Sequence, residues 1–295
     1  MFNSCQDEIV YEYLENIKPP IADAGVPISI ILPTSFDTLR GKDSSFNGPI
    51  TGRLWSLISG PNVPTIHSPS SAVTRISNLV AGVYKLQYAV IDSAGLTGVD
   101  TTSITVNGPQ IQTLTLQPAN STDAHIQVNG NSDYSNATAT EFSAGQWTHT
   151  GNPMTVRGLI KFDFSAIPTN ATIISAKLTL YSNPTPINGD GINANSGSAN
   201  AFYVGRNTSN WSVPATWFTQ PTMDLSTAIL VPHTSTNFLD ITDLNVTSLV
   251  QTMISTNNYG FKIQLQNEVA YNIRNFCSSR YSNAAKHPKI VITYQ

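Results

Sequence analysis

The chain has 295 residues, a formal net charge of −3 and only 11% charged residues. It contains no basic run of the kind that a nucleic-acid partner requires, and no apolar run approaches the length of a membrane span. Its length suffices for two domains that each bury a core, and its abundance of Ser, Thr and Asn is typical of extracellular β-proteins. The two cysteines, Cys5 and Cys277, lie almost a chain apart and are not expected to form a disulfide.

Residues 1–18 form an acidic segment that carries the whole charge imbalance, and Pro19 and Pro20 follow it as the end of a tether. A disordered leader is one interpretation. The tetrapeptide FNSC, residues 2–5, also resembles a bacterial lipobox, and the Gln-Asp-Glu after it is similar to the export signal of surface lipoproteins of Bacteroidetes. That resemblance implies a lipid anchor at Cys5 and a location on the extracellular face of the outer membrane, with secretion as the alternative.

Residues 19–107 contain short runs in which apolar and polar residues alternate, separated by clusters of Gly and Pro. This pattern predicts a small β-sandwich with Trp55 in its core. The segments PPIADAGVPISIILP, LWSLISGP, ISNLVAGVYKLQYAVIDSAGLTGVD and TTSITV resemble, in this order, a PKD-type immunoglobulin-like domain. The resemblance covers almost the whole region and implies the role of a spacer.

Residues 108–295 begin with a Gly-Pro linker and continue as a second series of strands. Two strands, each with one apolar face, are predicted within residues 157–181. Their apolar positions are Ile160, Phe162, Phe164, Ala176, Leu178 and Leu180. Residues 182–200 are rich in Gly, Asn and Ser and are predicted to form a long loop that is either functional or mobile.

One short helix is predicted in this second region, with an N-terminal cap at Thr242 or Asp243. The residues at helical spacing that form its apolar face are Val246, Leu249, Val250 and Met253. Asn257, Asn258 and Gly260 are expected to end it.

Six motifs of the second region resemble, in order, the DNRLRE domain of bacterial and archaeal surface proteins: TLTLQPANSTDAHI, RGLIKFDFSAIPTNATIISAKLTLY, ATWFTQP, FLDITDLNVTSLVQTMI, NNYGFKIQLQ and FCSSRYSNAAKHPKIVITY. The resemblance implies an all-β chain in which the PKD-type sandwich precedes a larger, jelly-roll-like β-sandwich. Some members of this group are similar to a carbohydrate-binding module family that recognises alginate, which implies a glycan ligand. Arg280 stands where the family commonly has an acid.

The sequence predicts no catalytic residues. Glycoside hydrolysis needs two carboxylates beside the bond, and the second region has only Glu141 and Glu268, which are far apart in the chain. The histidines show no spacing typical of metal ligands, and no Gly-x-Ser-x-Gly motif is present. No cofactor is predicted, although Asn131 and Asp133 supply oxygen ligands that suit calcium. Turn formation by these residues is the alternative.

Glycan binding is the sharpest functional hypothesis, because aromatic faces stack on sugar rings and basic groups bind sugar carboxylates. The residues predicted to contact the glycan are Trp147, Arg157, Lys161, Tyr271, Arg274 and Arg280. Four of these six are basic, which favours an anionic polymer that contains uronic acids. The expected protein is thus a non-catalytic, surface-located carbohydrate-binding or adhesion lipoprotein.

A structural or accessory lipoprotein is the competing hypothesis. In that case both domains dock to a protein assembly of the outer membrane, and no glycan is bound. An exposed apolar patch would favour this alternative, whereas a groove that carries aromatic and basic residues would favour glycan binding.

Overall fold

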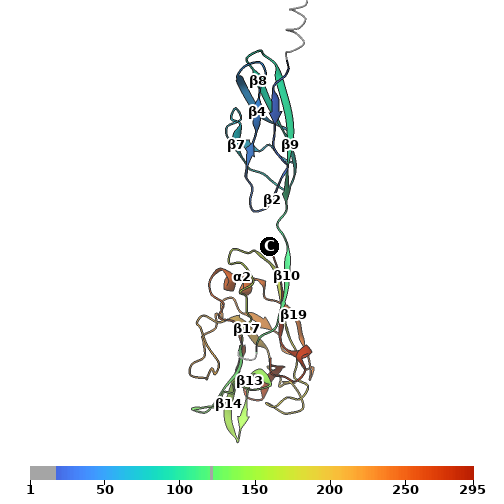
Figure 1. Cartoon of the computed structure of the whole chain (residues 1–295). Helices are drawn as coiled ribbons and strands as arrows, with labels where there is room; N and C mark the ends of the chain where they lie inside the picture. The colour runs from blue at the N-terminus through green and yellow to red at the C-terminus, as the bar shows by residue number, and fades with distance from the viewer. Residues whose placement is uncertain (1–17, 120–121) are drawn as a thin grey trace, which may run out of the picture. The chain divides into compact units, whose positions relative to one another are not determined.

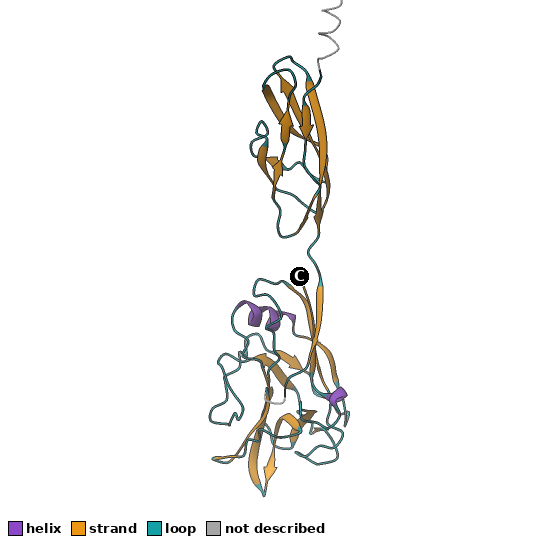
Figure 2. Cartoon of the chain, viewed as in Figure 1, coloured by secondary structure: helices purple, strands orange, loops and turns teal. Residues whose placement is uncertain are grey.

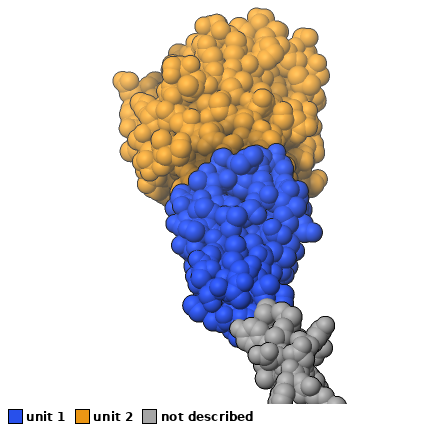
Figure 3. All heavy atoms as spheres, turned by 90° about the horizontal axis from the view of Figure 1, so that it is seen from above, with its two compact units in different colours: residues 1–110 blue, residues 111–295 orange. Residues whose placement is uncertain are grey.

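The structure is a computed structural model that describes residues 18–119 and 122–295. Cys5 and the acidic segment before Lys18 lie outside the described residues. The chain divides into two compact units, residues 1–110 and 111–295 (Figure 3). Strands dominate both units (Figures 1 and 2), and in the described part of the chain no helix has the length and apolar character that crossing a membrane would demand.

The first unit is a small β-sandwich. Its strands are β1 (Ile21–Asp23), β2 (Ile28–Ile31), β3 (Asp37–Arg40), β4 (Lys42–Ser44), β5 (Ile50–Ser59), β6 (Thr65–Ile66), β7 (Val73–Ser77), β8 (Gly82–Asp92) and β9 (Thr97–Asn107). One sheet has the order β2-β9-β8-β5, another has the order β3-β7-β6, and β1 pairs with β4. Trp55 is buried in the core and stacks on Tyr88, with ring centroids 4.6 Å apart.

The second unit is a larger β-sandwich with one short helix. Its elements are β10 (Gln112–Leu116), β11 (Asp123–Asn129), β12 (Ser132–Asp133), β13 (Glu141–His149), β14 (Asn152–Ile160), β15 (Ile173–Leu180), β16 (Asn195–Ser196), β17 (Phe202–Arg206), β18 (Ile229–Val231), β19 (Ile241–Asn245), α2 (Thr247–Ser255), β20 (Phe261–Leu265), β21 (Asn272–Cys277), the 3-10 turn η1 (Ala284–Lys286) and β22 (Lys289–Tyr294). The smaller sheet has the order β10-β22-β15-β19. The larger sheet has the order β16-β21-β13-β14-β20-β17-β18, with β11 paired to β14 and β12 to β11.

The region 157–181 connects the two sheets of this sandwich. β14 belongs to the larger sheet and β15 to the smaller one, and the apolar residues predicted from the alternation are all buried in one shared core. β14 ends at Ile160, but Phe162 and Phe164 still point into this core. Each buried phenylalanine contributes about 2 kcal/mol of hydrophobic stabilisation.

Helix α2 covers one edge of the same core. Leu249, Val250 and Met253 are buried, because they recur at the spacing of one helix face. The predicted caps are wrong: Thr242 and Asp243 belong to strand β19, and the N-cap is Val246, which makes no side-chain cap hydrogen bond. β19 pairs with β15 on both sides of these two residues, which lie at a register shift, so that tertiary pairing overrides the local capping preference.

The segment 182–200 is fastened to the sandwich by hydrogen bonds. Its central support is Glu141, a buried residue at the start of β13. The Glu141 carboxylate accepts hydrogen bonds from Asn183 Nδ2 (2.6 Å), the backbone N–H of Ile187 (3.0 Å) and both nitrogens of Asn188 (2.8 and 2.7 Å). Glu141 is therefore a structural carboxylate.

Candidate functional site

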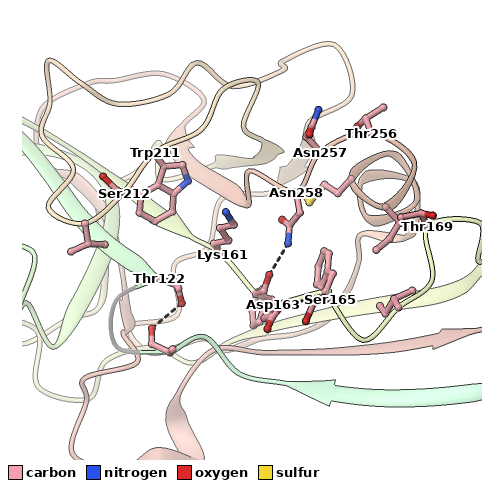
Figure 4. Close-up of a pocket in the computed structure, with 17 residues that line it drawn as sticks. Thr122, Lys161, Asp163, Ser165, Thr169, Trp211, Ser212, Thr256, Asn257 and Asn258 are labelled. Carbon is pink, nitrogen blue, oxygen red and sulfur yellow. Dashed lines mark hydrogen bonds between the residues drawn. The ribbon is translucent and has the colours of Figure 1, made fainter.

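A cleft of about 910 Å³ opens in the second unit beside the end of helix α2. Its apolar lining comes from buried residues such as Phe162, Phe164 and Met253. Its polar groups include Lys161 and Asn258, and the indole of Trp211 also lines it (Figure 4). An apolar floor with a few converging polar groups is the usual composition of a small-molecule site.

The residues of the cleft are held in place by the fold. The Trp211 indole N–H donates to the carbonyl oxygen of Tyr259 (2.7 Å), and Asn258 Nδ2 donates to the carbonyl oxygen of Phe162 (2.7 Å). Gly260 follows with φ of 76°, and a side chain there would collide with the carbonyl oxygen of Ile160. This glycine allows the chain to turn tightly from the cleft into β20.

Lys161 and Asp163 bring opposite charges to the cleft. The pKa of the Asp163 carboxyl is held below its usual value, chiefly by hydrogen bonding from Ser165 and further by the positive charge of Lys161. The Ser165 backbone N–H donates to Asp163 Oδ1 at 2.9 Å. Within the residues that the structure describes, Lys161 Nζ has no hydrogen-bond partner, so its ammonium group is available to a ligand.

Arg157 and Leu159 are on β14, and Lys161 follows directly after its end. Because side chains alternate along an extended chain, these three residues are expected on the same side. Leu159 is buried beneath Trp211 and Val213. Arg157 makes a two-pronged ion pair with Glu268, from Nε to Oε1 (2.8 Å) and from Nη2 to Oε2 (3.1 Å).

The Arg157 guanidinium also stacks over the ring of Trp217, at 4.5 Å from its centroid, and donates to Gln220 Oε1 at 3.2 Å. The same amide oxygen accepts a hydrogen bond from the buried Lys262 ammonium. Burial, and then the nearby charge of Arg157, lowers the pKa of Lys262 to about 8. We name Arg157, Trp217, Gln220, Lys262 and Glu268 the Arg157 cluster.

Trp147 and Tyr271 lie together in a different part of the larger sheet, near the turn between β13 and β14. Their rings meet edge to face with centroids 5.3 Å apart. Tyr271 is 57% exposed and has a left-handed backbone with φ of 64°. This pair is separate from the cleft, whose lining includes neither residue.

Of the other two arginines selected from the sequence, Arg274 is buried, whereas Arg280 is partly exposed and paired with a buried carboxylate. Arg274 is fully buried, with its guanidinium 5.2 Å from the ring centroid of Phe202 and its Nε donating to Asn195 Oδ1 (2.7 Å). Burial lowers the pKa of Arg274 to about 10. Arg280 forms an ion pair with the fully buried carboxylate of Asp123. Neither guanidinium lines the cleft, and we leave both out of the site proposed below.

Of the two calcium candidates, Asn131 lies in a turn and Asp133 ends the two-residue strand β12. Asp133 accepts from the backbone N–H groups of Ser135 and Trp217, both at 2.9 Å, and Asn131 is exposed next to it. Among residues 18–119 and 122–295 there is no group of three or more His, Cys, Asp or Glu side chains placed to hold a metal ion. Calcium binding stays a prediction.

Several residues of the site were not selected from the sequence. Trp211 is not among the residues predicted to contact the glycan, Asn257 and Asn258 were interpreted only as a helix end, and Lys262 has no distinguishing motif. The polar pair directly after an amphipathic helix is the one local signal that could have indicated the rim of a cleft. Pairing of β14 with β20 places Lys262 opposite Leu159, two residues from Arg157.

The second unit is a β-sandwich module with a cleft, and an immunoglobulin-like unit precedes it in the chain. Residues 113–294 match the family model described as "Carbohydrate-binding module family 96". This is more than half of the chain, which therefore belongs to that family. Residues 24–106 match the model described as "K319L-like, PKD domain".

Among proteins with similar sequences, low-density lipoprotein receptor-related protein 11 of Homo sapiens is 33% identical over 92 residues, 31% of this chain and 18% of its own length. The dyslexia-associated protein KIAA0319 of Homo sapiens is 30% identical over 92 residues, 31% of this chain and 9% of its own length. This chain thus spans less than a fifth of either relative. A solved PKD domain from the KIAA 1837 protein is 28% identical, with a TM-score of 0.28, and covers 30% of this chain and 87% of that one.

These matches confirm the predicted PKD domain, the predicted carbohydrate-binding module and the all-β fold with one short helix. Both matching family models describe domain types that are typically non-catalytic. The assignment to the DNRLRE domain, the lipidation of a Bacteroidetes-type lipoprotein and the location at the cell surface stay predictions.

Proposed function

We propose that residues 111–295 bind a polysaccharide in the cleft beside Lys161, with the PKD unit as a spacer. The observation that carries the proposal is the combination of an apolar floor, the indole of Trp211 and the available Lys161 ammonium in one cleft of about 910 Å³. An indole face stacks on a sugar ring, and an ammonium group binds a sugar carboxylate or hydroxyl. Membership of a carbohydrate-binding module family supports the same function.

An anionic, uronic-acid-containing polymer is the ligand class that we propose. The Lys161 ammonium is the group of the cleft that would bind a carboxylate, and a charge-assisted hydrogen bond is worth about 1.5–3 kcal/mol. We further propose, from the sequence motif at Cys5, that the protein is anchored by lipid at the cell surface or is secreted.

Calorimetric titration of the full chain with alginate, pectin and a neutral β-glucan tests the function. We expect binding to the uronic-acid polymers and a loss of about tenfold in affinity in Lys161→Ala. Lys177→Ala is the matched control, because Lys177 is a partly exposed lysine on β15 of the other sheet. The absence of binding to all three polymers would exclude the proposed function. Equal effects of both substitutions would exclude the cleft as its site.

One observation favours the alternative of docking to a protein assembly. Leu54, Ala89 and Val99 face one another across β5, β8 and β9 of the PKD unit, and Leu54 and Val99 are 52% and 57% exposed. An exposed apolar row on a sheet is a feature of interaction surfaces. If the protein is such an accessory protein, the unmodified chain should be chemically cross-linked to a membrane partner and bind none of the three polymers, and a Leu54→Ser, Val99→Ser variant should lose the cross-link.

A further inference from the structure

The guanidinium of Arg157 is held rigidly before any ligand arrives. It projects from the centre of the larger sheet, stacks over Trp217 at 4.5 Å and donates to Gln220 Oε1. The turn that carries Trp217 and Gln220 is itself fixed, since Gln220 Nε2 donates to the carbonyl oxygen of Trp217 (2.9 Å). A planar donor in a fixed orientation is suited to two-pronged recognition of a carboxylate.

The Arg157 guanidinium already binds a carboxylate of the same chain, that of Glu268. The two oxygens of Glu268 accept from Nε and Nη2 of Arg157 at 2.8 and 3.1 Å, which is the geometry that a free carboxylate would adopt. Glu268 belongs to residues 266–271, between β20 and β21, which are all exposed. The side chains of Arg157 and Glu268 are 20% and 29% exposed, so water and an external carboxylate reach the pair, and this solvent access limits its strength.

The charges of the Arg157 cluster are not balanced by Glu268 alone. Lys262 is only 3% exposed, and the oxygens that accept from its ammonium group are neutral ones, of Gln220 and Pro221. Two cations therefore share one carboxylate, and the cluster keeps a net positive charge. A carboxylate from outside that replaced Glu268 would meet the same pair of cations.

We infer that Arg157 is a second carboxylate-binding position of this module, and that Glu268 is an internal competitor which weakens the binding of anionic sugar polymers. The inference rests on the proposed polysaccharide binding and extends it beyond the cleft. Arg157 lies four residues before Lys161, roughly 13 Å along an extended chain. The Arg157 position therefore has its own ligand carboxylate, distinct from one bound by Lys161.

Glu268→Gln in the full chain tests this inference, because it removes the charge of the competitor and keeps its size. The probes are alginate oligosaccharides and neutral β-glucan oligosaccharides of equal length, titrated by calorimetry. We expect affinity for the alginate oligosaccharides to rise about two- to fivefold, in keeping with the strength of a solvent-accessible ion pair, and affinity for the neutral probe to stay unchanged. The double variant Arg157→Gln, Glu268→Gln should lose this gain.

Asp224→Asn is the matched control. Asp224 pairs with Arg206 at 3.0 Å on the same module, with similar partial burial, so its substitution changes the net charge equally without opening the Arg157 position. The inference is overturned if Glu268→Gln gives no gain, if Asp224→Asn gives the same gain, or if the double variant keeps it.

Polysaccharide binding in the cleft and the role of Glu268 as a competitor can be excluded independently of each other. If Lys161→Ala weakens binding and Glu268→Gln changes nothing, polysaccharide binding in the cleft stands and the role of Glu268 is excluded. If neither the unmodified chain nor Glu268→Gln binds any polymer, both are excluded. Circular dichroism of each variant establishes that the compared proteins are folded.

Discussion

The three arginines selected from the sequence lie in three different environments. Arg157 is partly exposed and paired with Glu268, Arg280 is paired with the buried Asp123, and Arg274 is buried between aromatic rings. A buried guanidinium stabilises the fold only through its contacts, because it has lost its hydration. Basic residues that look equivalent in the sequence therefore differ in what their removal should change.

Arg274→Ala should lower stability and not ligand affinity. The substitution leaves a cavity beside Phe202 and removes the donor to Asn195 Oδ1, and we expect the free energy of unfolding to fall by about 3 kcal/mol. Urea denaturation measures it. Arg206→Ala, which breaks a partly exposed ion pair, should cost about 1 kcal/mol or less. Weaker polymer binding with unchanged stability in Arg274→Ala would contradict this prediction.

Lys262 should make stability rise with pH in the alkaline range. Its pKa is lowered from 10.5 to about 8 in the folded protein, chiefly by burial and then by Arg157. Between these values the unfolded chain binds more protons, so stability increases with pH. Relative to Lys262→Met, which cannot titrate, the unmodified chain should gain roughly 2–3 kcal/mol between pH 7 and pH 10. Urea denaturation of both proteins at the two pH values measures the difference, and parallel pH curves would contradict it.

At the scale of the elements, the segment 182–200 shows how a polar loop acquires a fixed structure. The sequence predicts a loop from its Gly, Asn and Ser content. The structure adds that Glu141 fastens the start of the loop, and that Asn195 and Ser196 form β16 against β21. Backbone N–H groups that are not paired within a sheet need another acceptor. The buried Glu141 carboxylate supplies it for Ile187 and Asn188.

Glu141→Ala should release this segment. Its donors include the backbone N–H groups of Ile187 and Asn188, which would lose their acceptor. We expect these two amides to exchange hydrogen at least tenfold faster, and the free energy of unfolding to fall by about 3 kcal/mol. Hydrogen exchange with mass spectrometry checks this prediction. Glu268→Ala should leave exchange in this segment unchanged, and equal protection in Glu141→Ala would show that other contacts hold it.

At the scale of the whole chain, each unit has a core of its own. The core around Trp55 contains only residues of the first unit, and the core around Phe162 contains only residues of the second. Cooperative unfolding follows the boundaries of such cores. The two units should therefore unfold as separate transitions.

Trp55→Ala should affect only one of these transitions. Trp55 is 1% exposed and stacks on Tyr88, so its removal should cost about 3–5 kcal/mol in the first unit. We expect scanning calorimetry of the full chain to show one transition shifted to lower temperature, the other unmoved, and alginate binding retained. A shift of both transitions would show that the units are coupled.

The sequence by itself determined the all-β class, the apolar positions of the two cores and the apolar face of the helix. Ile160, Phe162, Leu178 and their neighbours could be assigned to the core because hydrophobic periodicity is a local property. Only the tertiary structure decided which polar and aromatic residues share a site. Lys161 meets Trp211 through the path of distant loops, and Arg274 is buried while Arg157 is not, because the environment of a charge depends on the segments that pack around it.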